Sequence, residues 1–413
     1  MPKKKKLKVL QTMTWLAPGG GADIHVYLSL LGLKEKNKYD LHFTVGEEIY
    51  HNPFEEIEGL KIHYCKDMVR PVSFKHDFRA LWYYYKLIKR EKFDIVHTHE
   101  TKASVITRVA AWLAGCPIII YGLHGVVFND PLSWLRRNFY IWLERSTIWM
   151  SDFILSVSQS SIDEYHKAGI AREMPYQITY SGIDTDHFIQ NSTLSPETRR
   201  QRRAELGISP EDTVLINVGR FSYSKAQRYT IEAFAQLKKR FDNLKLVFVG
   251  QGELEEACKA QAKELGIQED VIFYGFTNDV PGVLSLADIN VLTSLREGLP
   301  RVVVEASLCG LPTVSFQVEG IQEILMRGHA GKIVPQYDVP ALVEALSELI
   351  ADPELQQTYA ERARAHARKN WDYRKMVADI DELYDRLANE KLREDELWEA
   401  TYRADIAPQG SRA

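Results

Sequence analysis

The sequence predicts an α/β protein with two doubly wound domains that face each other across a cleft. Short runs of β-branched residues alternate with longer amphipathic stretches, and this alternation stops near 182–198 before it starts again. Such alternation is typical of a mostly parallel sheet with helices on both faces. The length of 413 residues also fits two domains, because one domain takes about 100–200 residues.

Five buried parallel strands are predicted in the first half of the chain, each from a short apolar run. They are 7–13, 40–46, 93–99, 117–125 and 152–158. Between them lie two stretches, 78–91 and 104–115, whose apolar residues are spaced as on one face of a helix. The basic start of the chain, MPKKKK, is followed by an apolar run that Lys8, Gln11 and Thr12 interrupt. This pattern favours a first strand over an export signal.

The second half repeats the pattern, and 370–402 is charged and predicted to be helical. The predicted strands of this half are 213–220, 244–252, 271–276, 288–294 and 312–316. The organisation that follows has an N-terminal Rossmann-like domain over 1–185, a C-terminal Rossmann-like domain over 186–370, a helix over 371–402 packing back on the first domain, and a flexible tail over 403–413. Ligands of such sheets bind at the carboxyl ends of the strands, so the loops there are expected to hold the chemistry.

Composition excludes several classes of protein. Charged residues make up 26% of the chain and the net charge is −4, which argues against a nucleic-acid partner. The four cysteines are scattered without metal-like clustering, as is typical of reduced thiols in a reducing compartment. No apolar run approaches the roughly 18 residues of a membrane-spanning helix. We therefore expect a cytoplasmic protein.

One segment, SLREGLPRVVVEAS, places Glu297 and Glu305 eight positions apart around a predicted turn and helix start. Pro300 is expected at the first helical position, where no backbone N–H is needed. The free amides of Leu299, Arg301 and Val302 would then form an anion site at the helix start. A diphosphate held there would place a ribose against Glu305 and a sugar near Glu297. A helix cap with an incidental glutamate explains the pattern equally well.

The segment 297–305 resembles the E-x7-E motif of retaining glycosyltransferases of the family-4 type, which have the GT-B fold. Other segments resemble motifs of the same family in the same order along about 8–375 of the chain. They are 18–23 (PGGGAD), 94–100 (DIVHTHE), 121–125 (YGLHG), 180–184 (YSGID), 218–225 (VGRFSYSK), 248–256 (FVGQGELEE) and 273–276 (FYGF). The sequence departs from the family's pattern at Ser181, Ala226 and Glu319, close to the linker and the donor site.

The resemblance implies a retaining transferase that moves a sugar from a nucleotide sugar to a glycan, lipid or small-molecule acceptor. UDP-sugars are the family's commonest donors, and GDP-mannose is the main competitor. Arg220 and Lys225 would hold the donor diphosphate and offset its charge as it leaves. Glu305 would bind the ribose, and Glu297 the donor sugar.

The same resemblance assigns further site residues. His124 would lie beside the transferred sugar, whereas His97 and His99 are equally compatible with structural roles. The glycine-rich loop with its Gly20 and Gly21 would approach a phosphate or the acceptor. The remaining donor-binding residues are Gly275, Phe276, Gly298, Leu299, Pro300 and Arg301.

No cofactor is expected beyond the donor itself. The sequence has no DxD-type motif in the expected place, so Arg220 and Lys225 are expected to replace a metal. It also lacks a G-x-G-x-x-G loop, which argues against a nicotinamide enzyme. Two alternatives stay open: a nucleotide-sugar 2-epimerase, and a non-catalytic sugar-nucleotide-binding subunit. The acceptor, the linkage, the choice of sugar and nucleotide, and the oligomeric state do not follow from the sequence.

A membrane partner is a further possibility. The segment 131–150 interleaves tryptophans with arginines, and four lysines precede the first strand. Both features suit a peripheral contact with anionic lipid at the inner face of a membrane. A core-packed helix with a solvated basic face explains them as well.

Overall fold

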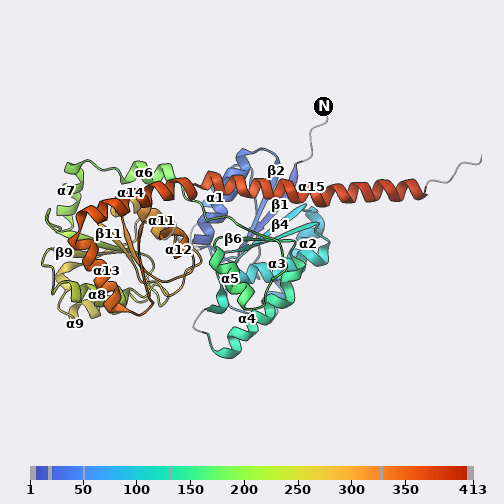
Figure 1. Ribbon diagram of the computed structural model, residues 1–413. Helices are drawn as coiled ribbons and strands as arrows, with labels where there is room; N and C mark the ends of the chain where they lie inside the picture. The colour runs from blue at the N-terminus through green and yellow to red at the C-terminus, as the bar shows by residue number, and fades with distance from the viewer. Residues whose placement is uncertain (1–5, 17–20, 50–51, 130–131, 326–328, 407–413) are drawn as a thin grey trace, which may run out of the picture. The chain divides into compact units, whose positions relative to one another are not determined.

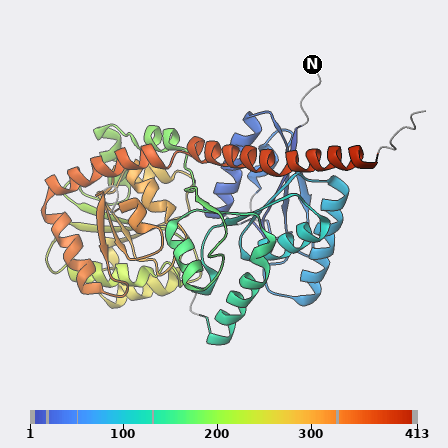
Figure 2. The same ribbon diagram turned by 45° about the vertical axis from the view of Figure 1, so that its right-hand side comes forward.

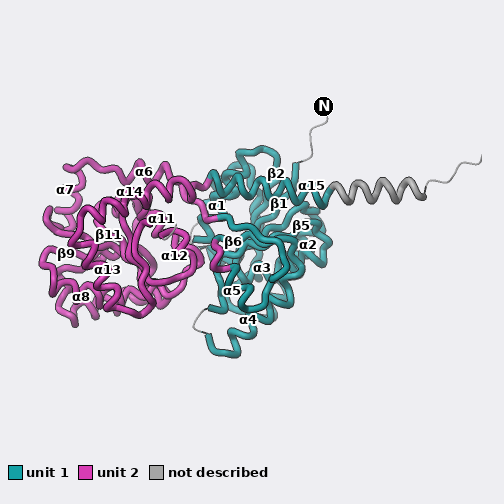
Figure 3. Tube along the Cα trace, in the orientation of Figure 1, with its two compact units in different colours: residues 1–157, 162–179, 374–413 teal, residues 158–161, 180–373 magenta. Residues whose placement is uncertain are grey.

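The chain folds into two compact units, which Figure 3 colours separately. The structure is a computed structural model that describes residues 6–16, 21–49, 52–129, 132–325 and 329–406, without the side chains of 393–406. Unit 1 comprises Met1–Val157, Ile162–Thr179 and Arg374–Ala413, and unit 2 comprises Ser158–Ser161 and Tyr180–Tyr373. The chain therefore passes between the units at four points, and each unit contains its own parallel sheet.

Unit 1 has a seven-stranded parallel sheet in the order β3-β2-β1-β4-β5-β6-β7. The strands are β1 (Leu7–Thr12), β2 (Tyr39–Val45), β3 (Lys61–Tyr64), β4 (Ile95–His99), β5 (Ile118–Leu123), β6 (Phe153–Ser156) and β7 (Tyr176–Ile178). Central β1 pairs with β2 on one side and with β4 on the other.

Helices cover both faces of this sheet (Figures 1 and 2). They are α1 (Gly21–Glu35), α2 (Phe74–Glu91), α3 (Thr101–Ala114), α4 (Trp134–Thr147), α5 (Gln159–Lys167) and α15 (Tyr373–Ile406). Alternate residues of a strand point to opposite faces. Accordingly, Leu10 packs in a cluster with residues of α2 and α3, whereas Gln11 bonds Ser29 of α1 and Tyr384 of α15.

Unit 2 has a six-stranded parallel sheet in the order β10-β9-β8-β11-β12-β13. The strands are β8 (Thr213–Val218), β9 (Leu244–Val249), β10 (Val271–Gly275), β11 (Ile289–Leu292), β12 (Thr313–Phe316) and β13 (Gly331–Val334). Its helices are α6 (Thr185–Ser192), α7 (Pro196–Glu205), α8 (Gln227–Leu237), α9 (Glu255–Glu264), α10 (Val280–Leu284), α11 (Arg301–Leu308), α12 (Ile321–Leu325), α13 (Val339–Ala351) and α14 (Pro353–Asn370).

The core of unit 2 has two parts, one on each face of the sheet. Leu215 packs with residues of α8 and α13, and its neighbour Ile216 packs with residues of α10 and α11. Both strand residues are fully buried. This explains why the central strands are continuous apolar runs rather than alternating patterns.

The ten strands predicted from apolar runs are confirmed, with ends that differ by a few residues. Three strands were not predicted: β3, β7 and β13. All three lie at the edge of a sheet. The predicted polar connection at 182–198 differs more, because it forms α6 and the start of α7. The Asp184 and Ser195 side chains cap these helices by accepting from the amides of His187 and Thr198.

The strand orders locate two places where ligands are expected to bind. In an open parallel sheet, ligands bind beyond the carboxyl ends of the strands where the strand order reverses. In unit 1 this point lies between β1 and β4, and in unit 2 it lies between β8 and β11. The loops that follow these four strands contain most of the predicted site residues.

Candidate functional site

Two loops of unit 2 are joined at its switch point, the one after β8 and the one after β11. The Leu295 amide donates to the Ser224 carbonyl at 2.8 Å. The Thr293 hydroxyl lies 2.9 Å from that of Thr230 and donates to the Ala226 carbonyl at 3.1 Å. Ala226 itself has the left-handed φ of 49°, which is the conformation that a glycine at this position would adopt without strain.

An ion pair links these loops across 72 positions of the sequence. The Lys225 ammonium lies 2.5 Å from a carboxylate oxygen of Glu297, and the two side chains are 25% and 12% exposed. The pair is therefore shielded but still reached by solvent. Sequence reasoning assigned both residues to the donor but did not predict that they contact each other.

The start of α11 follows directly from this loop. The helix begins at Arg301, with Pro300 as its N-cap residue, one position later than predicted. The Arg301 amide donates to the Leu299 carbonyl at 2.8 Å, so the prediction of a free amide at this residue was wrong. The tight turn made by Pro300 causes this bond. Gly320 packs against this turn. Its φ is +73°, and a Cβ at this position would lie 3.0 Å from the Gly298 carbonyl oxygen, so the close contact favours a glycine.

Glu305 lies in α11 and is the second glutamate of the motif. Burial raises the pKa of Glu305, and the charges of Arg301 and Lys225 oppose this shift. The Arg301 guanidinium donates to the Ser181 hydroxyl and the Gly182 carbonyl, both at 2.7 Å. The Arg301 side chain therefore fixes the backbone at 181–182, a role that sequence reasoning missed.

The rest of the predicted donor site lies at the ends of β8 and β10. Arg220 pairs with Glu253 at 3.3 Å, but both side chains are more than half exposed, and such a pair contributes little stability. Gly275 ends β10 with a φ of +84°, and its carbonyl accepts from the Gly250 amide at 2.8 Å. Phe276 is exposed directly after it. All these residues are at the carboxyl edge of the sheet of unit 2.

The predicted residues of unit 1 lie at its own carboxyl edge. His124 follows β5, and one of its ring nitrogens hydrogen-bonds His99 at 2.8 Å. His97 hydrogen-bonds the Tyr384 hydroxyl of α15 at 2.8 Å. Burial lowers the pKa of His124 to about 4 and that of His97 to about 3, so both imidazoles are neutral at physiological pH. Gly21 begins α1, whereas Gly20 lies outside the described residues.

A residue that sequence reasoning did not single out, Glu100, lies at the same edge. It follows β4, and its carboxylate accepts from the Thr14 amide of the loop after β1 at 2.8 Å. An acidic residue directly after a central strand was the available signal. Among the residues that the structure describes, no three His, Cys, Asp or Glu side chains are grouped as a metal site.

The fold and these two edges define a GT-B glycosyltransferase that uses a nucleotide-sugar donor. The family described as "Glycosyl transferases group 1" matches residues 198–366, and the family described as "Glycosyltransferase Family 4" matches residues 19–187. The chain belongs to these family-4-type glycosyltransferases.

Three known proteins illustrate the similarity. The UDP-Gal:alpha-D-GlcNAc-diphosphoundecaprenol alpha-1,3-galactosyltransferase of Escherichia coli is 26% identical over 332 residues, which cover 79% of this chain and 84% of the relative. A GDP-mannose-dependent alpha-(1-6)-phosphatidylinositol monomannoside mannosyltransferase of Mycolicibacterium smegmatis is 30% identical over 211 residues, covering 49% of this chain and 54% of the relative. The crystal structure of Anabaena Alr3699/HepE in complex with UDP superposes with a TM-score of 0.73 at 21% identity, covering 92% of this chain and 99% of HepE.

Proposed function

We propose that the protein transfers a sugar from a UDP-sugar to a hydroxyl of a glycan or lipid-linked acceptor, with retention of the anomeric configuration. The observation that carries the proposal is the Lys225–Glu297 ion pair at the switch point of unit 2, with the half-buried Glu305 in the helix that follows. This arrangement combines a cation for a diphosphate with two carboxylates that accept hydroxyl hydrogen bonds.

The roles follow from the charges. On donor binding the Lys225 ammonium moves from the Glu297 carboxylate to the diphosphate, and exposed Arg220 adds a second positive charge. These cations stabilise the negative charge that grows on the leaving nucleoside diphosphate. Glu297 then accepts hydrogen bonds from the donor sugar, and Glu305 accepts those of the ribose. Because two cations perform the work of a metal ion, transfer needs none.

The relatives support UDP over its competitor. The E. coli relative carries UDP-Gal in its name, and HepE was crystallised with UDP. The M. smegmatis relative uses GDP-mannose, and it matches only half of this chain. GDP-mannose therefore belongs in any test of the donor.

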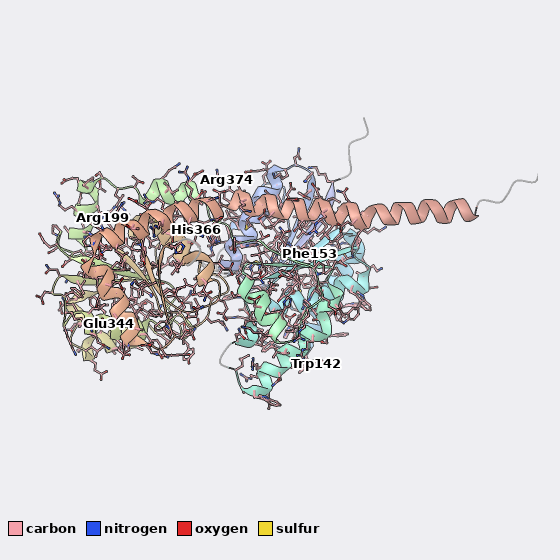
Figure 4. The ribbon with its side chains drawn as sticks, in the orientation of Figure 1. Trp142, Phe153, Arg199, Glu344, His366 and Arg374 are labelled. Carbon is pink, nitrogen blue, oxygen red and sulfur yellow. The ribbon has the colours of Figure 1, made fainter. Side chains whose placement is uncertain are left out.

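A lipid-linked acceptor and a peripheral membrane contact are supported by the surface of α4. Trp134 and Trp142 are 74% and 62% exposed on this helix, and Arg136 and Arg137 are exposed beside them. Trp142 is labelled in Figure 4. Exposed aromatic residues beside cations suit an anionic lipid interface. Both relatives named above act on lipid-linked molecules. No helix in the described ranges has the length and apolar character needed to cross a membrane.

The test measures release of nucleoside diphosphate from UDP-glucose, UDP-galactose, UDP-N-acetylglucosamine and GDP-mannose, with a synthetic α-GlcNAc-diphospholipid as the acceptor probe. We expect one UDP-sugar to be used, an axial anomer in the product by NMR, and unchanged rates in EDTA. Lys225→Ala should lower kcat/KM at least ~100-fold, as losing one charge-stabilising group does, while the matched variant Lys239→Ala retains activity. Use of GDP-mannose alone would disprove the assignment of a UDP-sugar as the donor. A product with the inverted anomeric configuration would disprove the retaining mechanism.

A further inference from the structure

Arg301 is an almost buried cation at the start of α11. Its side chain is 10% exposed, and its Nη1 donates to both the Ser181 hydroxyl and the Gly182 carbonyl at 2.7 Å. Among the residues that the structure describes, Nε of Arg301 has no hydrogen-bond partner. A charged group that is removed from water and only partly hydrogen-bonded lowers stability. Unit 2 therefore keeps a positive charge at this position at a cost in stability.

The neighbour of this charge is the carboxylate of Glu305. Nε of Arg301 lies 4.0 Å from Oε1 of Glu305, which is four residues further along α11 and hence on the same face of the helix. The Glu305 side chain is 15% exposed, and its carboxylate has no hydrogen bond to any of the described residues. Both of its oxygens can therefore accept hydrogen bonds from hydroxyl groups of a ligand.

The backbone that receives the hydrogen bonds of Arg301 is itself fixed. Ile183, the residue that follows this backbone, forms a parallel β-bridge with Asp372. At Gly182 the two segments are so close that a Cβ would lie 2.3 Å from the Cα of Tyr373. All of these residues belong to unit 2. The guanidinium is therefore bonded to a well-fixed part of the unit, and we expect it to stay beside α11 when a ligand binds.

The charges around Glu305 come from three parts of unit 2. Burial raises the pKa of Glu305, and the charge of Arg301 opposes this shift more strongly than that of Lys225 does. In the proposed transfer, the Lys225 ammonium moves to the diphosphate. On the next turn of α11, burial raises the pKa of the Cys309 thiol to about 12, and Arg364 of α14 acts on that thiol. Arg301 is therefore the cation that remains beside Glu305 when the donor is bound.

We propose that Arg301 is a positioning residue of the donor site, whose charge holds the Glu305 carboxylate as the acceptor of the ribose hydroxyl groups. An ionised carboxylate only accepts hydrogen bonds, whereas a protonated one replaces an acceptor site with a donor. A cation within about 4–6 Å lowers the pKa of a carboxyl group by about 1–3 units. This inference rests on the proposed function, and it makes the preference for a ribonucleotide over a 2′-deoxyribonucleotide depend on Arg301.

Two substitutions separate the charge of Arg301 from its hydrogen bonds. Arg301→Gln removes the charge but keeps an amide that donates hydrogen bonds. Arg301→Lys keeps the charge but has no planar guanidinium. Arg364→Gln is the matched control, because Arg364 donates to two carbonyls at the other end of α11 and its charge does not contribute to the pKa of Glu305.

The measured quantity is the dissociation constant of 2′-deoxy-UDP divided by that of UDP, from titration calorimetry between pH 6 and pH 9. Both nucleotides carry the same diphosphate, so the titration of the diphosphate cancels in this ratio. We expect a wild-type ratio of at least ~10, since a hydrogen bond to a charged group is lost. Arg301→Gln should lower the ratio at least ~3-fold at pH 6 and recover it by pH 9, because the raised pKa of Glu305 leaves the carboxyl protonated only at the lower pH. Arg301→Lys and Arg364→Gln should keep the wild-type ratio.

Three results would overturn the assignment. They are a wild-type ratio near 1, an Arg301→Gln ratio that does not change with pH, and an Arg301→Lys ratio as low as that of Arg301→Gln. The second result, with both nucleotides bound equally weakly, would make Arg301 an anchor of the backbone at 181–182 alone. If Arg301→Gln does not fold, the ratio of Arg301→Lys decides. Failure of the proposed function has a separate signature, which is a wild-type protein that binds neither nucleotide and releases UDP from no UDP-sugar.

Discussion

At the scale of single residues, the buried ion pair between Arg108 and Glu144 shows how charge is tolerated in unit 1. The Arg108 guanidinium donates to Glu144 at 2.8 Å and to the Thr147 hydroxyl at 3.1 Å, and both charged side chains are 0% exposed. The guanidinium also lies 4.5 Å from the ring centre of Tyr121. Within the described residues, Nε and Nη1 of Arg108 and Oε1 of Glu144 have no hydrogen-bond partner. The hydrogen bonds of this pair therefore compensate only part of the free-energy cost of removing the two charges from water.

Breaking this pair should be much more costly than replacing it. Arg108→Met leaves the Glu144 carboxylate buried and unpaired, which is expected to lower the free energy of unfolding by about 3–5 kcal/mol. The double variant Arg108→Met/Glu144→Leu removes both charges and should recover most of that loss. Urea denaturation of the wild type, both single variants and the double variant measures the coupling. A double variant as unstable as Arg108→Met would show that the charges themselves stabilise the unit.

Buried histidines predict how stability depends on pH. Burial lowers the pKa of His42 and of His124 to about 4 and that of His97 to about 3. The unfolded chain protonates these residues near pH 6.5, so it binds more protons than the folded chain below that pH. Stability is then lost as the pH falls from about 6.5 to 4. Glu100 acts in the opposite direction between about 4.5 and 7, because its folded pKa is raised.

The three histidines outweigh this one carboxyl group, so the net effect of acid is destabilising. We expect the free energy of unfolding to fall by at least ~2 kcal/mol per pH unit near pH 5, since each proton difference contributes ~1.4 kcal/mol per unit. Urea midpoints at pH 7, 6 and 5 measure this dependence. His97→Asn should flatten the slope by about one proton. Stability that does not change between pH 7 and 5 would mean that these imidazoles are protonated in the folded protein.

At the scale of elements, the sequence predicts the strands in the middle of each sheet and misses three of the four edge strands, β10 being the edge strand that was predicted. The central strands are buried on both faces and are therefore rich in apolar residues, so their runs are visible in the sequence, although β4 also buries His97 and His99. Edge strands are short and partly solvated: β3 reads KIHY, and β7 has only three residues. The candidate site likewise has a part that the sequence predicts and a part that it does not. Glu297 and Glu305 are close in sequence, whereas the Lys225–Glu297 contact depends on the order of strands.

Packing between α1 and α15 illustrates a contact that no local pattern predicts. Gly32 of α1 lies against Val377 of α15, and a Cβ on Gly32 would be 2.4 Å from a methyl carbon of Val377. The branched valine side chain cannot turn away freely in a helix. Tyr384, further along α15, reaches the sheet and hydrogen-bonds His97 and Gln11. The close approach at Gly32 allows this part of α15 to complete the core of unit 1.

Adding a methyl group to α1 at this contact should destabilise the protein. Gly32→Ala overpacks the contact and is expected to cost about 1–3 kcal/mol, although alanine is the better helix former. Val377→Ala on the second helix should restore most of the loss, with a coupling energy above ~0.5 kcal/mol. Thermal or urea unfolding of the four proteins in the cycle gives this coupling. A stabilised Gly32→Ala would show that helix propensity outweighs packing here.

At the scale of the whole molecule, neither unit is a single stretch of chain. Unit 1 is completed by residues from Arg374 onward, so the unit that begins the sequence also ends it. The four residues to which the proposed function gives donor contacts lie between Tyr180 and Tyr373, in unit 2. They are Arg220, Lys225, Glu297 and Glu305. Each unit has its own sheet and core, and therefore a ligand of one unit should stabilise that unit in preference to the other.

Calorimetry with UDP tests this division. At about 100 times its dissociation constant, a ligand adds about 2.7 kcal/mol to the free energy of unfolding. For a unit of this size that energy raises the Tm by about 5–10 °C. We expect UDP to shift only the transition of unit 2, and Arg108→Met to lower only that of unit 1, which identifies the two transitions. Glu305→Ala should abolish the UDP shift without changing the transition of unit 1. Equal shifts of both transitions would place part of the UDP site in unit 1 and contradict the assignment of the donor to unit 2 alone.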